Sequence, residues 1–381
     1  MLYRAIGLMS GSSLDGLDIV FAEFQEQGGK WAYEILQADC SAYSSEWKKD
    51  LSQATELTAA DYLLLHSRFG HYLGEQVNHF IEQNQLQYKV GLIASHGHTT
   101  FHIPSQKMTA QLGDGAAIAS VTGLPVVSDL RAMDVANGGQ GAPIVPMGEK
   151  ILLSDYDLFL NIGGIANISC HFPEFSKAPP KEGLPAGQAG LGEAIAFDVC
   201  PANRVLNLLA EKAGKEFDDK GAMAASGNID ELLLSDLNQL DYYKKAYPKS
   251  LANSFGIDII YPLIKSRNIS IENGLRTYTE HVAVQISQAI TSLIKNTSNC
   301  KLLVTGGGAF NDFLISRLGD LVKPSGVEIT IPDQKLVQYK EALIMAFLGV
   351  LRWREESTVL SSVTGATRST IGGALWIGQE A

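Results

Sequence analysis

The sequence lacks the features that mark several large classes of protein. It has no block of Lys and Arg, and its formal net charge is −11 at pH 7. We therefore expect no nucleic-acid partner, because binding a phosphate backbone needs clustered positive charge. The start of the chain has no basic leader followed by an apolar stretch and a cleavage site, and no later stretch is long and apolar enough to span a membrane. We expect no secretory signal and no membrane association.

Cysteines are few and scattered. They form no C-x-x-C pair and no Cys/His cluster; they are Cys40, Cys170, Cys200 and Cys300. We expect free thiols in a reducing cytoplasm and no zinc site. The 381 residues, 45% of them hydrophobic, are enough for two domains.

A hydroxyl-rich turn interrupts the first apolar run, AIGLMSGSSLDGLDIVFAEF (residues 5–24). The flanks favour strands, so the segment predicts a β-hairpin. Its tip offers hydroxyls at Ser10, Ser12 and Ser13, and Gly11 and Gly16 let backbone amides approach a ligand. Asp15 or Asp18 could hold a hydrated cation. The tip suits a phosphate and its metal ion, and an ordinary hairpin with a polar turn is the alternative.

Two later segments have related designs. DLFLNIGGIANISCHF (157–172) again places a glycine-rich tip between apolar strands, and CKLLVTGGGAFNDFLISRLGDLV (300–322) reads as strand, glycines and helix. Backbone amides at Gly306, Gly307 and Gly308 would lie where that strand ends and the helix begins, a place that favours nucleotide groups. The triplet is neither a Walker A sequence nor the dinucleotide fingerprint.

Polar residues are densest between the hairpins. VGLIASHGHTTFH (90–102) predicts a strand that ends in polar residues, and Arg131 and Asp134 precede the flexible turn GGQGAP. Ligands of open α/β sheets bind at the carboxyl ends of strands, so we expect these residues to meet in one cleft. His96 and His98 could also be a metal pair, but no third ligand is evident nearby.

The order of hairpin, second hairpin and glycine turn resembles the duplicated actin-like ATPase and sugar kinase superfamily. More specifically, the runs GLMSGSSLDGLD, SHGHTTFH, GDGAAIA, GLPVVSDLRAMDVANGGQGAPIVP, NIGGIANIS, FDDKGAMAASG and TGGGAFNDFL resemble the anhydro-N-acetylmuramic acid kinase family, in that order and over nearly the whole chain. The resemblance implies a two-domain α/β actin-like fold, built from duplicated ribonuclease-H-like domains with a central cleft. We expect residues 1–129 plus 361–381 in one domain and 130–360 in the other, with a helix over 361–376 and closure on ligand binding.

The resemblance also implies a reaction and its participants. ATP and water open the anhydro ring of 1,6-anhydro-N-acetylmuramic acid and give N-acetylmuramic acid 6-phosphate and ADP, in recycling of the bacterial cell wall. Asp134 matches the catalytic base, although a helix N-cap or an Arg131 partner is the alternative. Glu341 matches a glutamate that faces the sugar; we expect it to open an amphipathic helix, where dipole complementarity is the alternative. His96, Gly97 and Arg131 match substrate-binding positions beside these two carboxylates.

The implied cofactors are ATP and Mg²⁺, and the implied assembly is a homodimer. Mg²⁺ would bind at Asp15 and Asp18 through water. The residues implied to bind ATP lie in the two hairpins and the glycine turn: Gly11, Ser12, Ser13, Leu14, Asp15, Gly16, Leu17, Asp18, Asn161, Gly163, Gly164, Gly306, Gly307 and Gly308.

The chain departs from the family pattern at several positions. His98 stands where the family has glutamine, and Cys200 and Ala202 stand where it has glycines. We expect Cys200 to be a buried structural thiol, and we expect Lys249 either to meet an anionic group of the sugar or simply to be solvated. A kinase of a related anhydro or amino sugar therefore stays open, as does a non-catalytic nucleotide-binding regulator of the same fold.

Overall fold

The computed structural model describes residues 1–11, 14–171, 194–247, 249–252, 254–294 and 299–378. These residues form two compact units. Unit 1 contains residues 1–154 and 339–378, and unit 2 contains residues 155–171 and 194–338. The functional domain boundaries inferred above, at residues 129 and 360, stay a prediction. In the described part of the chain, no helix is both long and apolar enough to cross a membrane.

Unit 1 is built on a mixed sheet. Its strands are β1 (Leu2–Ser10), β2 (Gly16–Gln27), β3 (Lys30–Ala42), β4 (Leu92–Ile103), β5 (Met108–Leu112), β6 (Val126–Ser128) and β12 (Ala374–Trp376). The order across the sheet is β12-β6-β4-β1-β2-β3, and β5 pairs with β4. β1 is antiparallel to β2 and parallel to β4, which confirms the predicted first hairpin.

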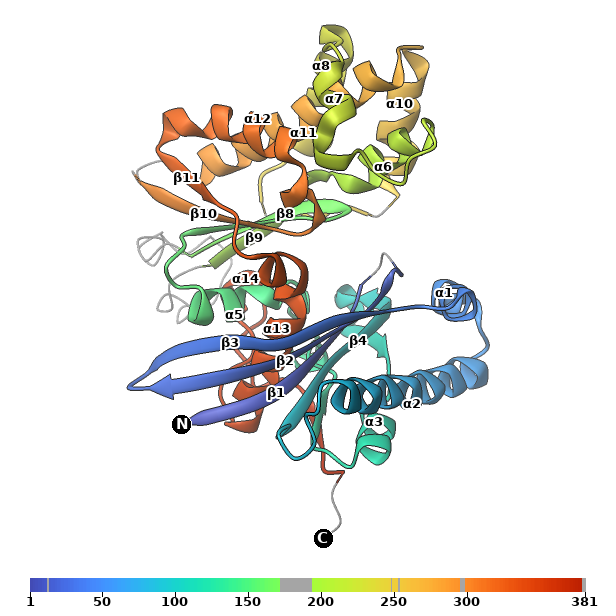
Figure 1. Cartoon of the computed structure of the whole chain (residues 1–381), viewed down its shortest axis with the longest axis vertical. Helices are drawn as coiled ribbons and strands as arrows, with labels where there is room; N and C mark the ends of the chain where they lie inside the picture. Colours follow the sequence, from blue (N-terminus) through green and yellow to red (C-terminus); the bar gives the residue numbers. More distant parts are fainter. Residues whose placement is uncertain (12–13, 172–193, 248, 253, 295–298, 379–381) are drawn as a thin grey trace. The chain divides into compact units, whose positions relative to one another are not determined.

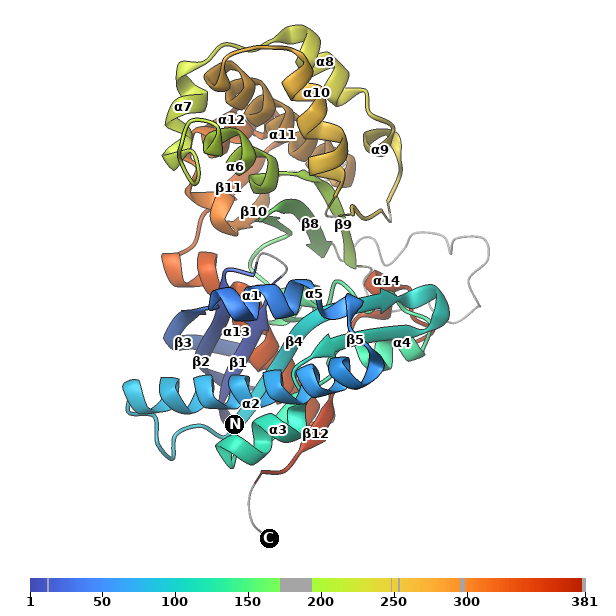
Figure 2. The same ribbon diagram turned by 90° about the vertical axis from the view of Figure 1, so that its right-hand side faces the viewer.

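Helices cover both faces of this sheet. They are α1 (Ser45–Ser52), α2 (Ala59–Gln83), α3 (Gly115–Thr122), α4 (Ala132–Ala136), α5 (Val145–Leu152), α13 (Gln334–Trp353, in this unit from residue 339) and α14 (Ser361–Thr364). α2 buries Leu65, Phe69, Leu73, Val77 and Phe80, whose spacing of three or four residues makes one apolar stripe. Figures 1 and 2 show α2 and α3 on one face of the sheet, and this stripe belongs to the core formed there with β1 and β2.

The opposite face carries α13. Phe347 of this helix packs against Phe24 of β2 and Trp31 of β3, with ring centroids 5.3 and 5.0 Å apart. A Cβ atom added at Gly7 of β1 would collide with the backbone at Ala342, so glycine permits the close approach of helix and sheet. Unit 1 is therefore a layered α/β structure.

Unit 2 has the same strand pattern. Its strands are β7 (Leu158–Ile162), β8 (Ile165–His171), β9 (Ala194–Pro201), β10 (Cys300–Thr305) and β11 (Val327–Thr330), in the order β11-β10-β7-β8-β9. β7 and β8 confirm the second predicted hairpin, β8 and β9 are also antiparallel, and β10 is parallel to both β7 and β11. Both sheets thus place an antiparallel three-strand meander beside two parallel strands, as a duplicated fold requires. The predicted α/β class is confirmed.

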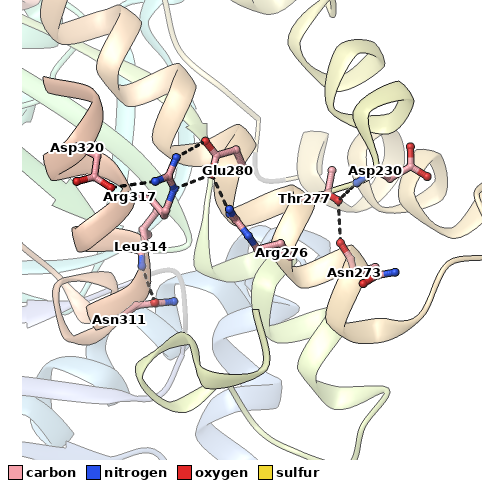
Figure 3. Close-up of polar contacts among 9 residues, drawn as sticks. All are labelled: Asp230, Asn273, Arg276, Thr277, Glu280, Asn311, Leu314, Arg317 and Asp320. Atoms are coloured by element: carbon pink, nitrogen blue, oxygen red, sulfur yellow. Dashed lines mark hydrogen bonds and ion pairs between the residues drawn. The ribbon is translucent and has the colours of Figure 1, made fainter. Parts of the chain in front are cut away.

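The helices of unit 2 are α6 (Asn203–Glu211), α7 (Ala222–Ser226), α8 (Glu231–Asn238), α9 (Asp241–Lys244), α10 (Tyr261–Ser266), α11 (Ile271–Leu293) and α12 (Asp312–Val322). Polar contacts hold several of them to the long helix α11 (Figure 3). Asp230 caps the N-terminus of α8, and its own backbone N–H donates to Thr277 Oγ1 of α11 at 2.9 Å. Glu280 of α11 forms ion pairs with Arg276 and with Arg317 of α12.

The prediction of one helix over residues 361–376 is wrong. The structure has only the short helix α14, after which the chain enters β12 and pairs antiparallel with β6. Gly365, with φ 77°, ends α14, and Gly373, with φ 107°, directly precedes β12; residues other than glycine rarely adopt these φ values.

Candidate active site

A pocket of about 280 Å³ lies within unit 1. It contains four of the predicted site residues, Gly11, His96, Arg131 and Glu341. Its other lining residues come from β1, β4, α13 and the segment before α5: Met9, Ser10, His98, Thr99, Gly141, Ala142, Pro143, Ile144, Val145 and Met345. Of the polar residues expected to meet in one cleft, His96, His98, Thr99 and Arg131 line this pocket, and Asp134 does not.

The histidines reach the pocket from an irregular point in β4. Ser95 pairs with Leu8, but the next pair joins His98 to Ser10, so the register shifts between them. Gly97 has φ 70° at this shift, and a Cβ atom there would lie 2.5 Å from the Leu112 carbonyl oxygen. Our expectation that the strand ends at these residues is wrong, because β4 continues to Ile103 through its pairing with β5.

Both histidines are neutral near pH 7. Burial, and to a smaller extent the charge of Arg131, lower the pKa of His96 to about 4. Burial alone lowers the pKa of His98 to about 4. In the described part of the chain no group of three or more His, Cys, Asp or Glu side chains could hold a metal ion, so a metal pair at these histidines has no support.

Arg131 holds the segment that forms one wall of the pocket. Its Nε donates to the Gly141 carbonyl oxygen at 2.7 Å, and a terminal nitrogen donates to Thr99 Oγ1 at 2.8 Å. Burial lowers the pKa of Arg131 to about 10, and the Asp134 charge opposes this shift. The guanidinium therefore stays charged at neutral pH and places a positive charge at the pocket.

Asp134 lies in α4 and is completely buried, and it is not among the residues that line the pocket. Its Oδ2 accepts from the Gly141 backbone N–H and its Oδ1 from Thr364 Oγ1, both at 2.7 Å. Asp134 is inside the helix, so the alternative of an N-cap is wrong. Burial raises its pKa, whereas the two hydrogen bonds and then Arg131 lower it. A raised carboxyl pKa suits a general base.

Glu341 is half-buried and lines the pocket. Our expectation that it opens a helix is wrong, since α13 begins at Gln334 and Glu341 lies in its third turn. First-turn dipole complementarity therefore does not explain this glutamate. Burial raises its pKa, Lys340 lowers it and Glu149 raises it again. Lys340 and Glu149 form a buried ion pair of 2.6 Å between α13 and α5.

The tip of the first hairpin combines backbone approach with carboxylates. Ser12 and Ser13 lie outside the described residues. Leu14 has φ 57°, and Gly16 has no room for a Cβ atom, which would lie 2.7 Å from the Ser41 carbonyl oxygen. Leu17 points into the core, so only its backbone could contact a ligand.

Asp18 is the perturbed carboxylate of this hairpin. Burial raises its pKa to about 6, a hydrogen bond from Cys40 lowers it, and the charges of Asp15 and Glu341 raise it. A cation would relieve this repulsion, and because no group of three or more protein ligands occurs in the described residues, Asp15 and Asp18 could hold a divalent ion only with water as its other ligands.

The glycine turns of unit 2 lie on neighbouring strands. Asn161 of β7 pairs with Thr305 of β10, so the turn at Gly163 and Gly164 adjoins the turn at Gly306. Gly306 has φ 80° and ψ 165°, and a Cβ atom there would collide with the Asn161 side chain. The Asn203 side chain, close to Gly307, donates to the Ile162 carbonyl oxygen at 3.0 Å. The predicted nucleotide-binding glycines of unit 2 therefore lie on adjacent strands, whereas Gly11 and Gly16 belong to unit 1.

The glycine triplet does not itself begin the following helix, contrary to our expectation. A 3-10 turn spans Gly307–Phe310, and α12 begins only at Asp312. Asn311 caps this helix by accepting from the Leu314 backbone N–H at 3.0 Å (Figure 3). The backbone at Gly306 and Gly307 is therefore separate from the helix N-terminus.

The two residues that replace family glycines, Cys200 and Ala202, are both buried. Cys200 and Ala202 have no exposed surface, and burial raises the pKa of the Cys200 thiol, which confirms a buried thiol. Lys249 is neither fully solvated nor ion-paired in the described residues: its Nζ lies 4.7 Å from the centre of the Tyr242 ring. Its contact with a sugar stays a prediction.

Comparison with known proteins identifies the family. The family model described as anhydro-N-acetylmuramic acid kinase matches residues 3–378. An anhydro-N-acetylmuramic acid kinase of Methylobacterium nodulans is 33% identical over 97% of this chain and 98% of its own. One of Vibrio parahaemolyticus is 32% identical over 97% of each chain. This chain belongs to the anhydro-N-acetylmuramic acid kinase family.

Membership in the anhydro-N-acetylmuramic acid kinase family confirms the predicted enzyme class, an ATP-dependent sugar kinase. In structure the chain is also similar to a ROK family glucokinase from Streptomyces griseus in complex with glucose and AMPPNP, with a TM-score of 0.41 and 12% identity over 91% of this chain and 99% of that chain.

The sequence did not predict four residues that contact the side chains of the candidate site. Tyr43 donates to Ser10, Thr364 donates to Asp134, Thr99 accepts from Arg131 and Cys40 contacts Asp18. Only Thr364 carried a signal, since its T-G-A segment matches the family pattern. Tyr43, Thr99 and Cys40 act through contacts with distant parts of the chain, and no local sequence motif predicts such contacts.

Proposed function

We propose that this kinase transfers the γ-phosphoryl group of ATP to 1,6-anhydro-N-acetylmuramic acid while water opens the anhydro ring. The water oxygen bonds to the anomeric carbon, the bond from that carbon to the bridging oxygen breaks, and this oxygen accepts the phosphoryl group. The water proton passes to a base. The products are N-acetylmuramic acid 6-phosphate and ADP, and the reaction serves cell-wall recycling and amino sugar catabolism in the cytoplasm.

The pocket of unit 1 supports the proposal most strongly, because it combines a carboxylate, a guanidinium and neutral polar groups in one small space. We assign the sugar to this pocket. Arg131 is positioned to meet an anionic group of the ligand, while His96 and the strand at Gly97 contact neutral groups. The volume of about 280 Å³ is on the scale of one sugar residue.

Asp134 is the proposed general base, and Glu341 assists it. The two carboxylates differ in access, since Glu341 lines the pocket and Asp134 is covered by Gly139 and Gly141. Catalysis by Asp134 therefore requires that the Gly141 N–H release Oδ2 when substrate binds. If no such release occurs, Glu341 is the base, because its raised pKa also suits proton transfer.

We assign the phosphates of ATP to backbone groups at Gly11, Leu14 and Gly16, and the nucleoside to the glycine turns of unit 2. Ser12 and Ser13 belong to the same assignment. Asp15 and Asp18 would hold Mg²⁺ through water, and the ion would offset the charge of the phosphates. Preorganised charge of this kind stabilises phosphoryl transfer, whose transition state offers the protein little covalent chemistry to perform.

Incubation with the sugar, ATP and Mg²⁺ in oxygen-18 water tests the proposal. We expect a sugar 6-phosphate labelled at its anomeric hydroxyl, detected by mass spectrometry. Loss of product in Asp134→Asn, with ATP binding retained, identifies the base; a larger loss in Glu341→Gln transfers the role to Glu341. ATP hydrolysis without sugar phosphate contradicts the proposed substrate, and the same assay on related anhydro and amino sugars then tests the alternative. Light scattering tests the expected homodimer.

A further inference from the structure

Each histidine of the pocket has one ring nitrogen fixed by a neighbour. His96 Nδ1 lies 3.0 Å from the Gly97 carbonyl oxygen. A carbonyl oxygen can only accept a hydrogen bond, so Nδ1 must carry the proton. A neutral imidazole has one N–H, and therefore His96 Nε2 is an acceptor.

His98 has the opposite arrangement. Its Nδ1 lies 3.1 Å from Ser10 Oγ, which accepts from the Tyr43 hydroxyl at 2.8 Å. Ser10 is 3% exposed, so its own hydroxyl proton needs a hydrogen-bond acceptor. Among the described residues, His98 Nδ1 is the one hydrogen-bond acceptor that Ser10 contacts. Ser10 therefore donates to Nδ1, and the proton of His98 lies on Nε2.

We propose that His96 and His98 are held in opposite tautomers, so that their Nε2 atoms offer the pocket one acceptor and one donor for a neutral group that both donates and accepts. A sugar hydroxyl or a secondary amide is such a group. The identification of that ligand as a sugar rests on the proposed function, but the tautomers do not. In the part of the chain that the structure describes, no residue hydrogen-bonds to either Nε2, and both side chains line the pocket.

The two histidines discriminate between ligands. A ligand group that cannot both donate and accept leaves one Nε2 atom buried without a hydrogen bond. Both rings resist protonation, since burial lowers both pKa values and Arg131 adds its positive charge beside His96. The charged groups that face the pocket are Arg131 and Glu341. The donor and acceptor pattern is therefore constant at pH values well above 4.

Substitutions of the two histidines by Gln and by Phe separate the effect of hydrogen bonding from the effect of packing. His98→Gln retains an N–H donor near the Nε2 position, and His96→Gln retains a carbonyl acceptor; the Phe variants retain a ring and lose both. Loss of one hydrogen bond to substrate corresponds to about a tenfold fall in kcat/KM. We expect this fall in His98→Phe and His96→Phe, and recovery to within a few fold of the parent in the Gln variants. His79→Gln, a substitution in α2 outside the pocket, is the matched control.

Nitrogen-15 NMR of the full chain with labelled histidine tests the tautomers without ligand. The Gln variants assign the signals. We expect Nδ1–H for His96 and Nε2–H for His98 at pH 7. The same tautomer in both rings, or a charged ring, overturns the proposal. If the tautomers are opposite but the anhydro sugar is not turned over, the proposed function fails and the donor and acceptor pair stands.

Discussion

Thr364 Oγ1 donates a 2.7 Å hydrogen bond to Asp134 Oδ1, although the two residues are 230 positions apart in the chain. The Gly141 N–H occupies the other carboxylate oxygen at the same distance. Both bonds stabilise the ionised form of a carboxylate that burial destabilises. The charge of Asp134 at neutral pH therefore depends on residues from two other segments.

Thr364→Val should shift the acidic limb of the kcat/KM profile toward higher pH. Without the hydroxyl the pKa of Asp134 rises further, so a smaller fraction of this proposed base is ionised. We expect a fall of about tenfold on the acidic limb, the equivalent of one lost hydrogen bond, and a smaller fall at high pH. Thr364→Ser should restore the profile. A uniform fall at every pH would show that Thr364 has only a structural role.

Asp18→Asn should make the protein more stable and less active. The folded pKa of Asp18, about 6, exceeds the ordinary value of 3.8, so the folded state binds the extra proton between these values. The free energy of unfolding therefore falls as pH rises through this window, by about 3 kcal/mol in total. Urea unfolding should show the Asp18→Asn variant gaining that amount at pH 7.5 and nothing at pH 3.5.

Asp39 provides the control for this experiment, because it is exposed and lies on the neighbouring strand β3. Asp39→Asn should change the free energy of unfolding by less than about 0.5 kcal/mol. Loss of stability in Asp18→Asn at pH 7.5 would contradict the pKa shift. ATP affinity, measured by calorimetry with and without Mg²⁺, should fall in Asp18→Asn and not in Asp39→Asn.

Glu280→Gln should destabilise unit 2. Glu280 is 8% exposed and accepts from Arg317 and Arg276, which lower its pKa (Figure 3). Its contribution is present above the ordinary pKa of 4.5 and is lost as pH falls through the lower folded value. We expect a cost of about 2 kcal/mol at pH 7 that shrinks in acid.

The exposed ion pair of Lys244 and Asp241 is the comparison for Glu280, because its side chains are 65% and 94% exposed. Asp241→Asn should cost at most about 0.5 kcal/mol. Equal costs for the two substitutions in urea unfolding would mean that burial does not strengthen the Glu280 network.

Lys340→Met should be more harmful than replacement of both members of its ion pair. The single change leaves the charge of Glu149 buried without its lysine, which costs about 3 kcal/mol or more. Lys340→Met combined with Glu149→Leu should recover much of this loss. Because Lys340 also lowers the pKa of Glu341, we expect the pH profile of the single variant to move as well. Additive losses in the double variant would rule out coupling across the pair.

The hairpins were predictable because strand alternation and the turn that joins the strands are close in sequence. Both glycine turns and the strand before Gly306 follow from the same local signals. The length of β4 was not predictable, since its last residues are strand only through pairing with β5. The start of α13 was also missed, and with it the position of Glu341 inside the helix.

The site was predictable in composition and not in detail. His96, Arg131 and Glu341 do reach one pocket, but Asp134 lies beneath its surface and depends on Thr364. A sequence motif shows which residues are present. The burial and hydrogen bonding of those residues depend on other segments that pack against the motif in the fold. The roles of Tyr43 and Ser10 in fixing His98 have that origin.

The glycine at the register shift of β4 constrains how this pocket can evolve. A one-residue insertion or deletion in a strand exchanges its two faces, so at Gly97 it would turn pocket side chains toward the core. We therefore expect substitutions at residues 96 and 98 to be tolerated far better than a change in the length of this segment or the replacement of Gly97.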